Sequence, residues 1–418
     1  MSIELSQEQQ HIINYIMSEM KRCNFSCGSS SFRDLFNIIV GGYAGTGKTT
    51  LLAFLRKEIK VAYPNLSVAL VTYTGKASSL LKSKMESNYV DLSRDFIGTI
   101  HSLIYKAQVR WDKKLNCHVI IGWKLKTPDE VYYDLIIIDE GSMVSKEIWD
   151  DLQKLEKPII VMGDHGQLPP IGDSFNLMEH PHFKLNEIHR QALNSPIILL
   201  SKFVRDNGYI PFNTVFSKGV FKISWNHNKC KELWDSLIFD ENIIVLCAFN
   251  STRCELNSTI RNKLDFKEKI PCPSERIICL QNDHVRGIMN GQIATLIWIM
   301  PEGQDLYRMT LNVDGYNDYF EAGAVSDKCF GQVTYTMYDK SEAGKKQYNY
   351  AVKKGIAPIN YFDYGYAISV HKSQGSEWNK VVLFEQRTKH WDDQYYARWL
   401  YTAITRAKEK LFIISDYW

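Results

Sequence analysis

The sequence predicts an α/β fold with two domains, each built on a parallel sheet. Short apolar runs recur along both halves of the chain, and each ends in polar residues at its C-terminal end. Helical patterns separate most of these runs, as expected for a parallel sheet whose ligands gather at the carboxyl ends of its strands. Two stretches, 106–130 and 273–355, interrupt this alternation with signals of antiparallel β-structure.

The first half begins with a predicted helix and continues with buried strands. Residues 1–22 are expected to be helical, because Ser6 can cap the helix and isoleucine and methionine residues recur at helical spacing through 12–20. Each strand is a run of apolar, often branched side chains. The predicted strands are 36–40, 68–74, 135–140 and 158–164.

The second half repeats the pattern around a β-rich insertion. Strands are expected at 242–249, 364–370, 380–384 and 411–415, with helices at 252–264 and 395–410. Turn signals at Asn290-Gly291, Glu302-Gly303 and Asp314-Gly315 divide the insertion into short strands. We therefore expect a first domain over 1–190 with a hairpin at about 106–130, a second over 191–272 and 356–418, and an inserted subdomain over 273–355.

Composition excludes several classes of protein. The chain has 418 residues, 45% hydrophobic and 23% charged, which rules out a disordered tail, a collagen or a disulfide-held mini-protein. Fifty basic against 47 acidic residues give a net charge of +3, which neither indicates nor excludes a nucleic-acid partner. The nine cysteines form no CxxC pair, so we expect reduced thiols. Without a signal peptide or a long apolar run, we expect a soluble, cytoplasmic protein with no membrane partner.

The segment from Gly42 to Thr49 matches the phosphate-binding pattern GxxxxGK(S/T) in full. It follows a predicted strand and opens a helix, which is the context that this loop requires. Its glycines let backbone N–H groups surround phosphate oxygens, Lys48 would reach the β- and γ-phosphates, and Thr49 would supply its hydroxyl to Mg²⁺. The predicted nucleotide-binding residues of this loop are Gly42, Gly45, Thr46, Gly47, Lys48, Thr49 and Thr50.

Two carboxylates end the strand at 135–140. Asp139 is placed to hold Mg²⁺, directly or through water, and Glu140 to polarise the attacking water. Together with the loop they predict hydrolysis of a nucleoside triphosphate such as ATP, but not what the hydrolysis drives.

Further motifs narrow the function by their order and their placement at strand ends. They are TYTGKA (72–77), TIHS (99–102), GDHGQLPPI (163–171), LNEIHRQALNSPI (185–197), VHKSQGSEW (370–378) and YTAITRA (401–407). With these the chain resembles a superfamily 1 DNA helicase of the 5′-to-3′ RecD-like branch. Within that branch it is most similar to the compact Dda-type helicases of T-even phages, over nearly the whole chain.

This resemblance implies two RecA-like motor domains with ATP hydrolysed in the cleft between them. It implies that Gln9 reads the adenine, that Glu377 contacts the ribose, and that Gln167 senses the γ-phosphate. It assigns arginine fingers to Arg190 and Arg406, the latter expected on the helix at 395–410. The residues implied to touch single-stranded DNA are Thr74, His101, His371 and Ser373.

The resemblance also gives the two insertions a role. The hairpin at 106–130 occupies the place of a strand-separating pin, with Trp111 or Leu115 as candidates for its tip, and residues 273–355 occupy the place of an SH3-like subdomain. Tyrosines and lysines interleave over 335–354, which makes this stretch a candidate nucleic-acid surface, or an ordinary solvated face. Two positions depart from the family pattern: Gly141, where alanine or valine is usual, and Tyr73, where proline is usual.

Three functions remain open at this stage. A DNA helicase is favoured by the hairpin and by the motifs of the second domain. The alternatives are a DNA-stimulated translocase that remodels protein–DNA complexes with little unwinding, and another P-loop protein such as a nucleotide kinase or switch. For the helicase we expect a monomer, phage-encoded and acting in the host cytoplasm. Its expected partners are single-stranded and forked DNA together with replication, recombination or repair proteins.

Overall fold

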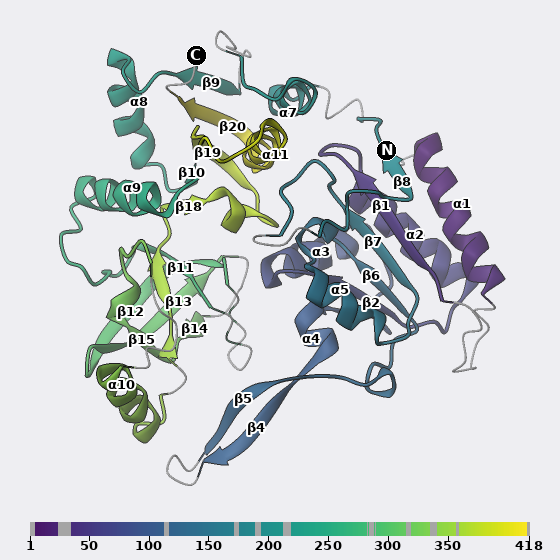
Figure 1. The fold of residues 1–418 in the computed structure, drawn as a ribbon, viewed down its shortest axis with the longest axis horizontal. Helices are drawn as coiled ribbons and strands as arrows, with labels where there is room; N and C mark the ends of the chain where they lie inside the picture. The colour runs from purple at the N-terminus through teal and green to yellow at the C-terminus, as the bar shows by residue number, and fades with distance from the viewer. Residues whose placement is uncertain are drawn as a thin grey trace. The chain divides into compact units, whose positions relative to one another are not determined.

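A computed structural model describes most of the chain (Figure 1). The described residues are 5–23, 35–112, 117–170, 175–188, 194–211, 219–281, 283, 288, 290–314, 319–334, 341–356 and 359–415, and within them the side chains of 109–112, 117–122 and 228 are left out. The chain divides into two compact units. Unit 1 comprises Met1–Gln108 and Gly122–Asp206, and unit 2 comprises Val109–Ile121 and Asn207–Trp418.

Unit 1 contains a six-stranded parallel sheet in the order β3-β2-β6-β7-β1-β8. The four strands predicted from the sequence are present, and β3 and β8 add one strand at each edge. Because all six strands are parallel, the loops that follow them lie at one edge of the sheet. The bounds are β1 Asn37–Gly42, β2 Val68–Thr72, β3 Phe96–Thr99, β6 Leu135–Ile138, β7 Ile159–Gly163 and β8 Phe183–Leu185.

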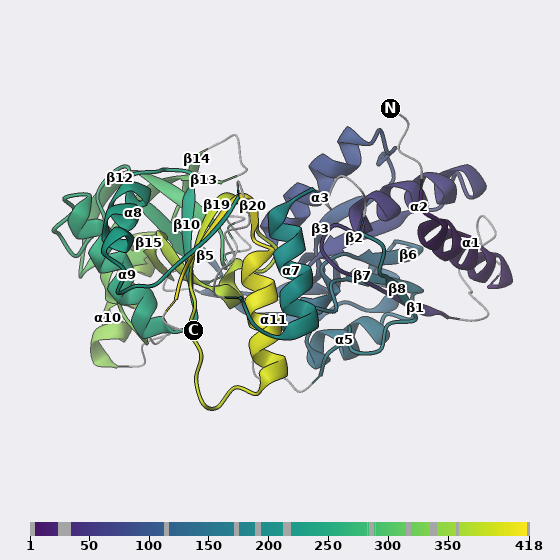
Figure 2. The same ribbon diagram turned by 90° about the horizontal axis from the view of Figure 1, so that it is seen from above.

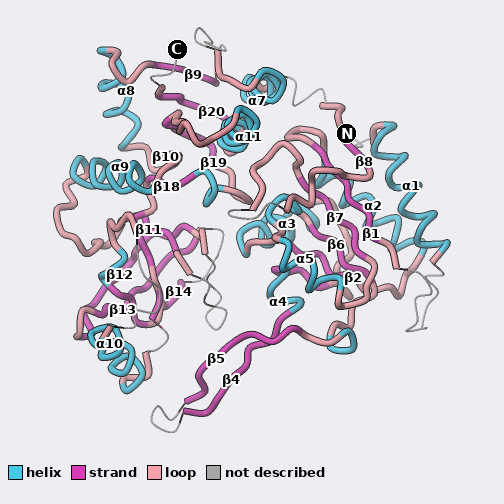
Figure 3. Tube along the Cα trace, in the orientation of Figure 1, coloured by secondary structure: helices cyan, strands magenta, loops and turns pink. Residues whose placement is uncertain are grey.

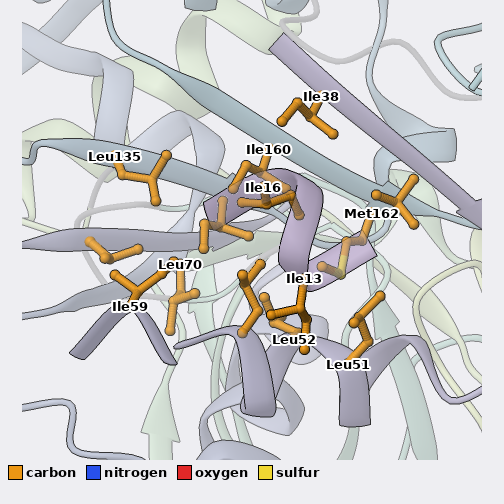
Figure 4. Packing of buried hydrophobic residues seen from close by; sticks show 14 of the residues in the cluster. Ile13, Ile16, Ile38, Leu51, Leu52, Ile59, Leu70, Leu135, Ile160 and Met162 are labelled. Carbon is orange, nitrogen blue, oxygen red and sulfur yellow. The ribbon is translucent and has the colours of Figure 1, made fainter. Parts of the chain in front are cut away.

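Helices cover both faces of this sheet (Figure 2). One face packs on α1 (Gln7–Arg22), α2 (Lys48–Ala62) and α3 (Gly75–Ser87), and Figure 4 shows part of that core, with Ile16 and Leu52 beside strand residues such as Leu70 and Ile160. The other face packs on α4 (Ile100–Ile104) and α5 (Lys146–Gln153). Alternate strand residues supply the two cores, so the central strands β6 and β7 have no polar side chain.

The leading helix forms as the sequence predicts. Ser6 caps α1, with its hydroxyl accepting from the Gln9 amide at 3.3 Å while the Gln9 side chain accepts from the Ser6 amide at 3.0 Å. This reciprocal pair fixes the first turn of the helix. It also fixes the position of the Gln9 side chain, which is 1% exposed.

Strands β4 (Tyr105–Asp112) and β5 (Cys117–Leu125) form a two-stranded sheet of their own (Figure 3). This confirms the predicted hairpin. Its turn, with Leu115, lies outside the described residues, as does the side chain of Trp111.

Unit 2 contains a second parallel sheet in the order β18-β10-β19-β20-β9. Helices α8 and α9 pack on one face, and α11 lies on the other side of the strands (Figure 2). Helix α7 (Pro196–Asn207) precedes the sheet and spans the boundary between the units. The other bounds are β9 Val220–Ile223, α8 Asn228–Ile238, β10 Ile243–Cys247, α9 Asn250–Lys263, β18 Ala367–Ser369, β19 Trp378–Phe384, α11 Asp393–Ile404 and β20 Ala407–Ile414.

A third, mixed sheet is present at the predicted β-rich insertion, but it extends past the predicted end at 355, because β16 and β17 belong to it. Its strands follow the order β16-β15-β13-β12-β11-β17, with β14 paired to β13, around a core of their own. The turn between β12 and β13 places Gly303, Gln304 and Asp305 at positive φ. The bounds are β11 Arg276–Cys279, β12 Ile293–Gly303, β13 Leu306–Val313, β14 Tyr319–Glu321, β15 Ala324–Ser326, α10 Glu342–Lys353, β16 Ile359–Asn360 and β17 Phe362–Tyr364.

The strand predicted at 364–370 is in fact two strands in different sheets. β17 pairs with β11 in the insertion, and β18 pairs with β10 in the parallel sheet. Gly365 lies between them, and a Cβ there would come within 2.8 Å of the Ile277 backbone. The lack of a side chain thus lets the chain pass close to β11 before it changes sheets.

Two buried ion pairs attach the insertion to α9. Arg261 donates to both oxygens of Glu275 at 2.6 and 2.9 Å, and Arg253 pairs with Asp363. All four side chains are at most 7% exposed. The two arginines of α9 bind the insertion, while Leu256 and Ile260 of the same helix pack in the core of the parallel sheet. Helix α9 therefore contacts both the insertion and the parallel sheet.

Among the described residues, no helix has the length and apolar character needed to cross a membrane. The seven cysteines whose side chains are described are free thiols.

An ion pair with no exposed surface joins the helix after the phosphate loop to the sheet. Arg56 of α2 donates to both oxygens of Asp95 at 2.7 and 2.8 Å. We expect Arg56→Met to lower the free energy of unfolding by about 3–5 kcal/mol, because it leaves a buried carboxylate without its partner. Urea unfolding measures the loss.

Two comparisons control that measurement. Arg56→Met/Asp95→Leu should recover most of the stability, since it removes both charges together. Lys60→Met, which breaks an exposed pair with Asp91, should change the unfolding curve little. Equal losses in the single and double variants of the buried pair would contradict the argument.

Candidate functional site

The phosphate-binding loop connects β1 to α2. Gly45 and Gly47 adopt positive φ, at 80° and 76°, and Gly47 caps α2 without a side-chain hydrogen bond. The first backbone N–H groups of α2 are therefore not capped by a side chain. An uncapped helix N-terminus behind a glycine-rich turn is suited to bind phosphate.

Lys48 lies folded over this loop. Its Nζ donates to the carbonyl oxygens of Gly42 at 2.7 Å and Tyr43 at 3.0 Å, and it lies 3.8 Å from Oδ2 of Asp164. The ammonium is thus held at the loop before any phosphate arrives. An anion bound in the loop would find the cation already in place.

Gln9 reaches the same loop from α1. Its Nε2 donates to the carbonyl oxygens of Thr46 and Gly47, both at 3.3 Å. The structure therefore brings the leading helix and the phosphate loop together.

The two carboxylates follow β6, which is separated from β1 by the single strand β7. Burial raises the pKa of Asp139, and the charges of Lys48 and Lys84 act in the opposite direction. A cation beside Asp139 would favour its ionised form, so the donor set fits a divalent metal ion held by Thr49 and Asp139. Glu140 is held in the left-handed region at φ 59°, which turns the chain sharply after the strand.

The close packing around position 141 explains why this chain has glycine there, where alanine or valine is usual in the family. A Cβ at this position would lie 2.3 Å from Cγ1 of Val161 and 3.2 Å from the carbonyl oxygen of Met162. Val161, on the neighbouring strand β7, occupies the space that a side chain at 141 would need.

The segment after β7 completes the group. Asp164 is 1% exposed and its Oδ1 accepts from the Gly166 amide at 2.9 Å, which forms a tight turn. Gln167 is 6% exposed, and its Oε1 has no hydrogen-bond partner among the described residues. A buried amide oxygen without a partner is unusual in a folded protein and is available to a ligand or a water.

Three residues near the loop were not found from the sequence. The Tyr43 ring contacts the His165 ring at 4.0 Å between centroids, and the Arg205 guanidinium lies 4.1 Å from the Tyr43 ring. Burial lowers the pKa of His165 to about 4, so the imidazole is uncharged at neutral pH. The sequence offered one signal for this cluster, which is an aromatic residue, Tyr43, at an unspecified position of the loop pattern. Its contact with Arg205 could not be predicted, because Arg205 lies far away in the sequence.

Thr74 and His101 follow β2 and β3, which are neighbours in the sheet. Thr74 caps α3 by accepting from the Ala77 amide at 3.2 Å. His101 lies in α4, and its ring contacts the Tyr105 ring at 5.1 Å. The structure thus places these two residues at the same edge of the sheet.

The residues predicted in unit 2 separate into two groups. His371 and Ser373 follow β18 in a short 3-10 helix, η4 (Val370–Ser373). Nε2 of His371 lies 2.8 Å from the Tyr395 hydroxyl, while the Ser373 side chain is fully buried and its hydroxyl donates to the Val370 carbonyl. Glu377 and Arg406 instead lie where β19 and β20 begin.

We expected Arg406 to lie on a helix, but the structure places it after the end of α11. Helix α11 ends at Ile404, and Arg406 follows its C-cap. The guanidinium is 4% exposed and donates to the carbonyl oxygens of Thr402 and Ser376 and to the Thr405 hydroxyl. A chain that enters β20 directly leaves no room for the predicted extra helical turn. Arg190 lies outside the described residues.

Comparison with known proteins defines the class. Residues 31–173 match the family described as an AAA domain, and residues 364–414 match the UvrD-like helicase C-terminal domain. The RecD subunit of Buchnera aphidicola (subsp. Acyrthosiphon pisum) is 27% identical over 90% of this chain and 69% of its own length. The ATP-dependent DNA helicase Pif1 of Campylobacter jejuni is 24% identical over 89% of this chain and 86% of its own length.

Other relatives are longer than the match. The chain spans 36% of an uncharacterised Methanocaldococcus jannaschii protein and 46% of the Deinococcus radiodurans RecD2 helicase. The Dda helicase of phage T4 is 24% identical over 62% of this chain, so the likeness to RecD and Pif1 covers more of it.

Solved structures share the fold. A structure of Pif1 helicases at forked double-stranded DNA superimposes with a TM-score of 0.55 and 18% identity, over 99% of this chain and 92% of that one. Bacteroides Pif1 bound to single-stranded DNA gives 0.51 and 19%, over 100% and 93%. Over most of its length the chain is therefore similar to the RecD subunit and to the Pif1 DNA helicase, and it shares its fold with the Pif1 structures.

The close packing of Gly141 gives a test of the site's architecture. We expect Gly141→Ala to lower the free energy of unfolding by about 1–3 kcal/mol, because its Cβ would collide with Val161. ATP hydrolysis should fall as well, since relief of the collision moves the adjoining Glu140.

The double variant Gly141→Ala/Val161→Ala should regain hydrolysis relative to Gly141→Ala, because it returns the missing space. Val161→Ala alone serves as the control for cavity formation. Wild-type stability and hydrolysis in Gly141→Ala would show that the strands move apart freely.

Proposed function

We propose that this protein moves 5′ to 3′ along single-stranded DNA and separates the duplex ahead of it, using ATP hydrolysed at the phosphate loop of unit 1. The observation that carries the proposal is the pair of sites on two parallel sheets. Lys48, Asp139 and Gln167 follow three strands of the first sheet, and the HKSQG and TRA segments border the strands of the second. A nucleotide kinase or switch does not require the HKSQG and TRA segments of a second sheet.

Each nucleotide-site residue has a proposed task. Lys48 and the backbone amides of 45–50 bind the phosphates, and Thr49 and Asp139 hold Mg²⁺. The bound ion supplies positive charge to the phosphate oxygens. Glu140 accepts a proton from the attacking water. The amide oxygen of Gln167, which has no protein partner among the described residues, accepts from that water, or the amide nitrogen donates to the γ-phosphate.

The base, the ribose and the second arginine complete the proposed site. Gln9 recognises adenine, Glu377 contacts the ribose, and Arg190 and Arg406 stabilise charge on the transferred phosphoryl group. Because the Arg406 guanidinium is bonded within unit 2, it would exchange at least one of these bonds for a phosphate oxygen.

The DNA is proposed to follow Thr74 and His101 in unit 1 and His371 in unit 2, whereas the Ser373 side chain is buried beneath this segment. Pif1 relatives are described with single-stranded DNA and with forked duplex DNA, which supports both as partners. We assign β4 and β5 as the strand-separating pin and the mixed sheet as an SH3-like subdomain. The hairpin favours a helicase of the compact Dda type over a translocase that only strips proteins from DNA.

Forked and tailed duplexes test polarity and unwinding. We expect strand separation with a 5′ single-stranded tail and none with only a 3′ tail, measured by displacement of a fluorescent strand. Replacement of residues 109–121 by a short glycine linker should abolish unwinding and spare DNA-stimulated ATP hydrolysis. Unwinding from a 3′ tail alone would overturn the polarity, and unwinding without the hairpin would overturn the pin.

Two substitutions separate nucleotide binding from hydrolysis. Lys48→Ala should lose ATP hydrolysis while it keeps single-stranded DNA binding, because Lys48 lies at the loop. Arg406→Ala should bind ATP but hydrolyse it about 10³-fold more slowly. Because Arg406 also bonds three groups of its own unit, a thermal unfolding curve must accompany the rates. Rapid hydrolysis by Arg406→Ala would refute its role as a finger.

A further inference from the structure

Unit 2 carries a group of aromatic side chains of which only one, His371, belongs to a motif named above. Its members, here called the aromatic platform, are Phe249, His371, Trp391 and Tyr395. The Trp391 ring lies 5.8 Å from the Phe249 ring and 5.0 Å from the Tyr395 ring, centroid to centroid. His371 joins through the 2.8 Å contact of its Nε2 with the Tyr395 hydroxyl.

The platform lies at the carboxyl ends of three neighbouring parallel strands. Phe249 follows β10, His371 follows β18, and Trp391 follows β19, the strands being adjacent in the order β18-β10-β19. Their last residues are nearly level, since Cys247 pairs with Ser369 and Leu246 with Leu383. This edge of an open α/β sheet is where ligands bind.

The four rings keep part of their surface exposed. All are half-buried, whereas Trp399, which packs 5.6 Å from Trp391, is 0% exposed. Trp399 is an ordinary core residue. Trp391 lies above it and keeps part of its ring surface for another partner.

A hydrogen-bonded side chain fixes the loops that carry the platform. Gln386, just after β19, accepts from the Ala248 amide at 3.0 Å and donates to the Thr252 hydroxyl at 2.8 Å. It thereby ties the loop of Phe249 to the segment that leads to Trp391. The rings are held in position before a ligand arrives, which reduces the entropy lost on binding.

The charge around the platform suits a nucleic acid. Lys389 and His390, next to Trp391, are exposed. The nearby carboxylates are engaged: Asp393 pairs with Arg387, and Asp392 caps α11 by accepting from the Tyr395 amide. The exposed Lys389 ammonium therefore adjoins flat aromatic rings, and a cation beside aromatic rings can bind single strands through phosphates and bases together.

We propose that the bases of single-stranded DNA stack on this aromatic platform, with Trp391 as its central residue and Phe249 beside it. The proposal rests on the helicase function proposed above and adds a base contact to the segment that contains His371. Stacking on a π-face accepts every base, as a motor that moves along any sequence requires.

The test compares a normal strand with one that lacks bases. Binding of an oligothymidylate of about fifteen nucleotides and of an abasic strand of equal length is measured by fluorescence anisotropy at fixed salt. We expect Trp391→Leu to weaken binding of the oligothymidylate by about five-fold or more and to leave the abasic strand unchanged. Trp391→Phe, which keeps a ring, should lose less than Trp391→Leu.

A matched control residue, Trp225, lies at the opposite edge of the same sheet. Trp225 follows β9, is 49% exposed and packs on Phe384, so Trp225→Leu removes an indole outside the platform and should bind both strands as the unsubstituted protein does. Equal losses on both strands in Trp391→Leu would mean that Trp391 only supports the fold, and no loss on either would mean that bases lie elsewhere. Either result would overturn the proposal that bases stack on the aromatic platform. If the wild-type protein still unwinds DNA, the proposed helicase function would stand. Failure of the wild-type protein to bind either strand or to unwind would overturn the helicase too.

Discussion

The candidate nucleotide site depends on the parallel register of β1, β7 and β6. Gly41 of β1 pairs with Gly163 of β7, and Val161 of β7 pairs with Ile138 of β6. This register brings the phosphate loop, the Asp164 turn and the Asp139-Glu140 turn to one edge of the sheet. A slip of one residue would turn every side chain to the opposite face and separate Lys48 from Asp164. The two apolar cores on either face hold the register, because each strand buries alternate residues in each core.

The close approach of these neighbouring strands explains why the site contains several glycines. At Gly41 a Cβ would come within 2.9 Å of the His165 ring, and at Gly163 within 2.6 Å of the Met178 sulfur. Gly141 faces Val161 in the same way. The turns after three neighbouring strands thus pack against one another, and a side chain on one turn must be matched by a space on the next. Covariation across strands, rather than a fixed residue at each position, is the pattern that this packing favours.

The sequence predicted those parts of the site that are local in the chain. The strand, glycine loop and helix around Lys48, the capping of α1 by Ser6, and the carboxylates after β6 each depend on a few consecutive residues, so their patterns are visible in one sequence. The contact of Arg205 with Tyr43 depends on a distant helix, and the division of 364–370 between two sheets depends on Gly365 passing beside Ile277. Such features arise from tertiary contacts that no local pattern encodes. Helix α11 was predicted too long for a related reason, since Arg406 could extend a helix but instead leads directly into β20.

The segment 370–378 links two ends of the second sheet. It begins after β18, where His371 joins the aromatic platform, and it ends where β19 begins, with Glu377 beside Arg406. The Trp378 amide donates to the Arg406 carbonyl at 2.8 Å, and the Arg406 guanidinium donates to the Ser376 carbonyl at 3.1 Å. A phosphate that drew the Arg406 side chain away would therefore break a bond to the same segment that carries His371. If Arg406 and His371 have the roles proposed above, a change in the nucleotide's charge would act on the end of the segment that carries His371 through a few bonds of one short segment.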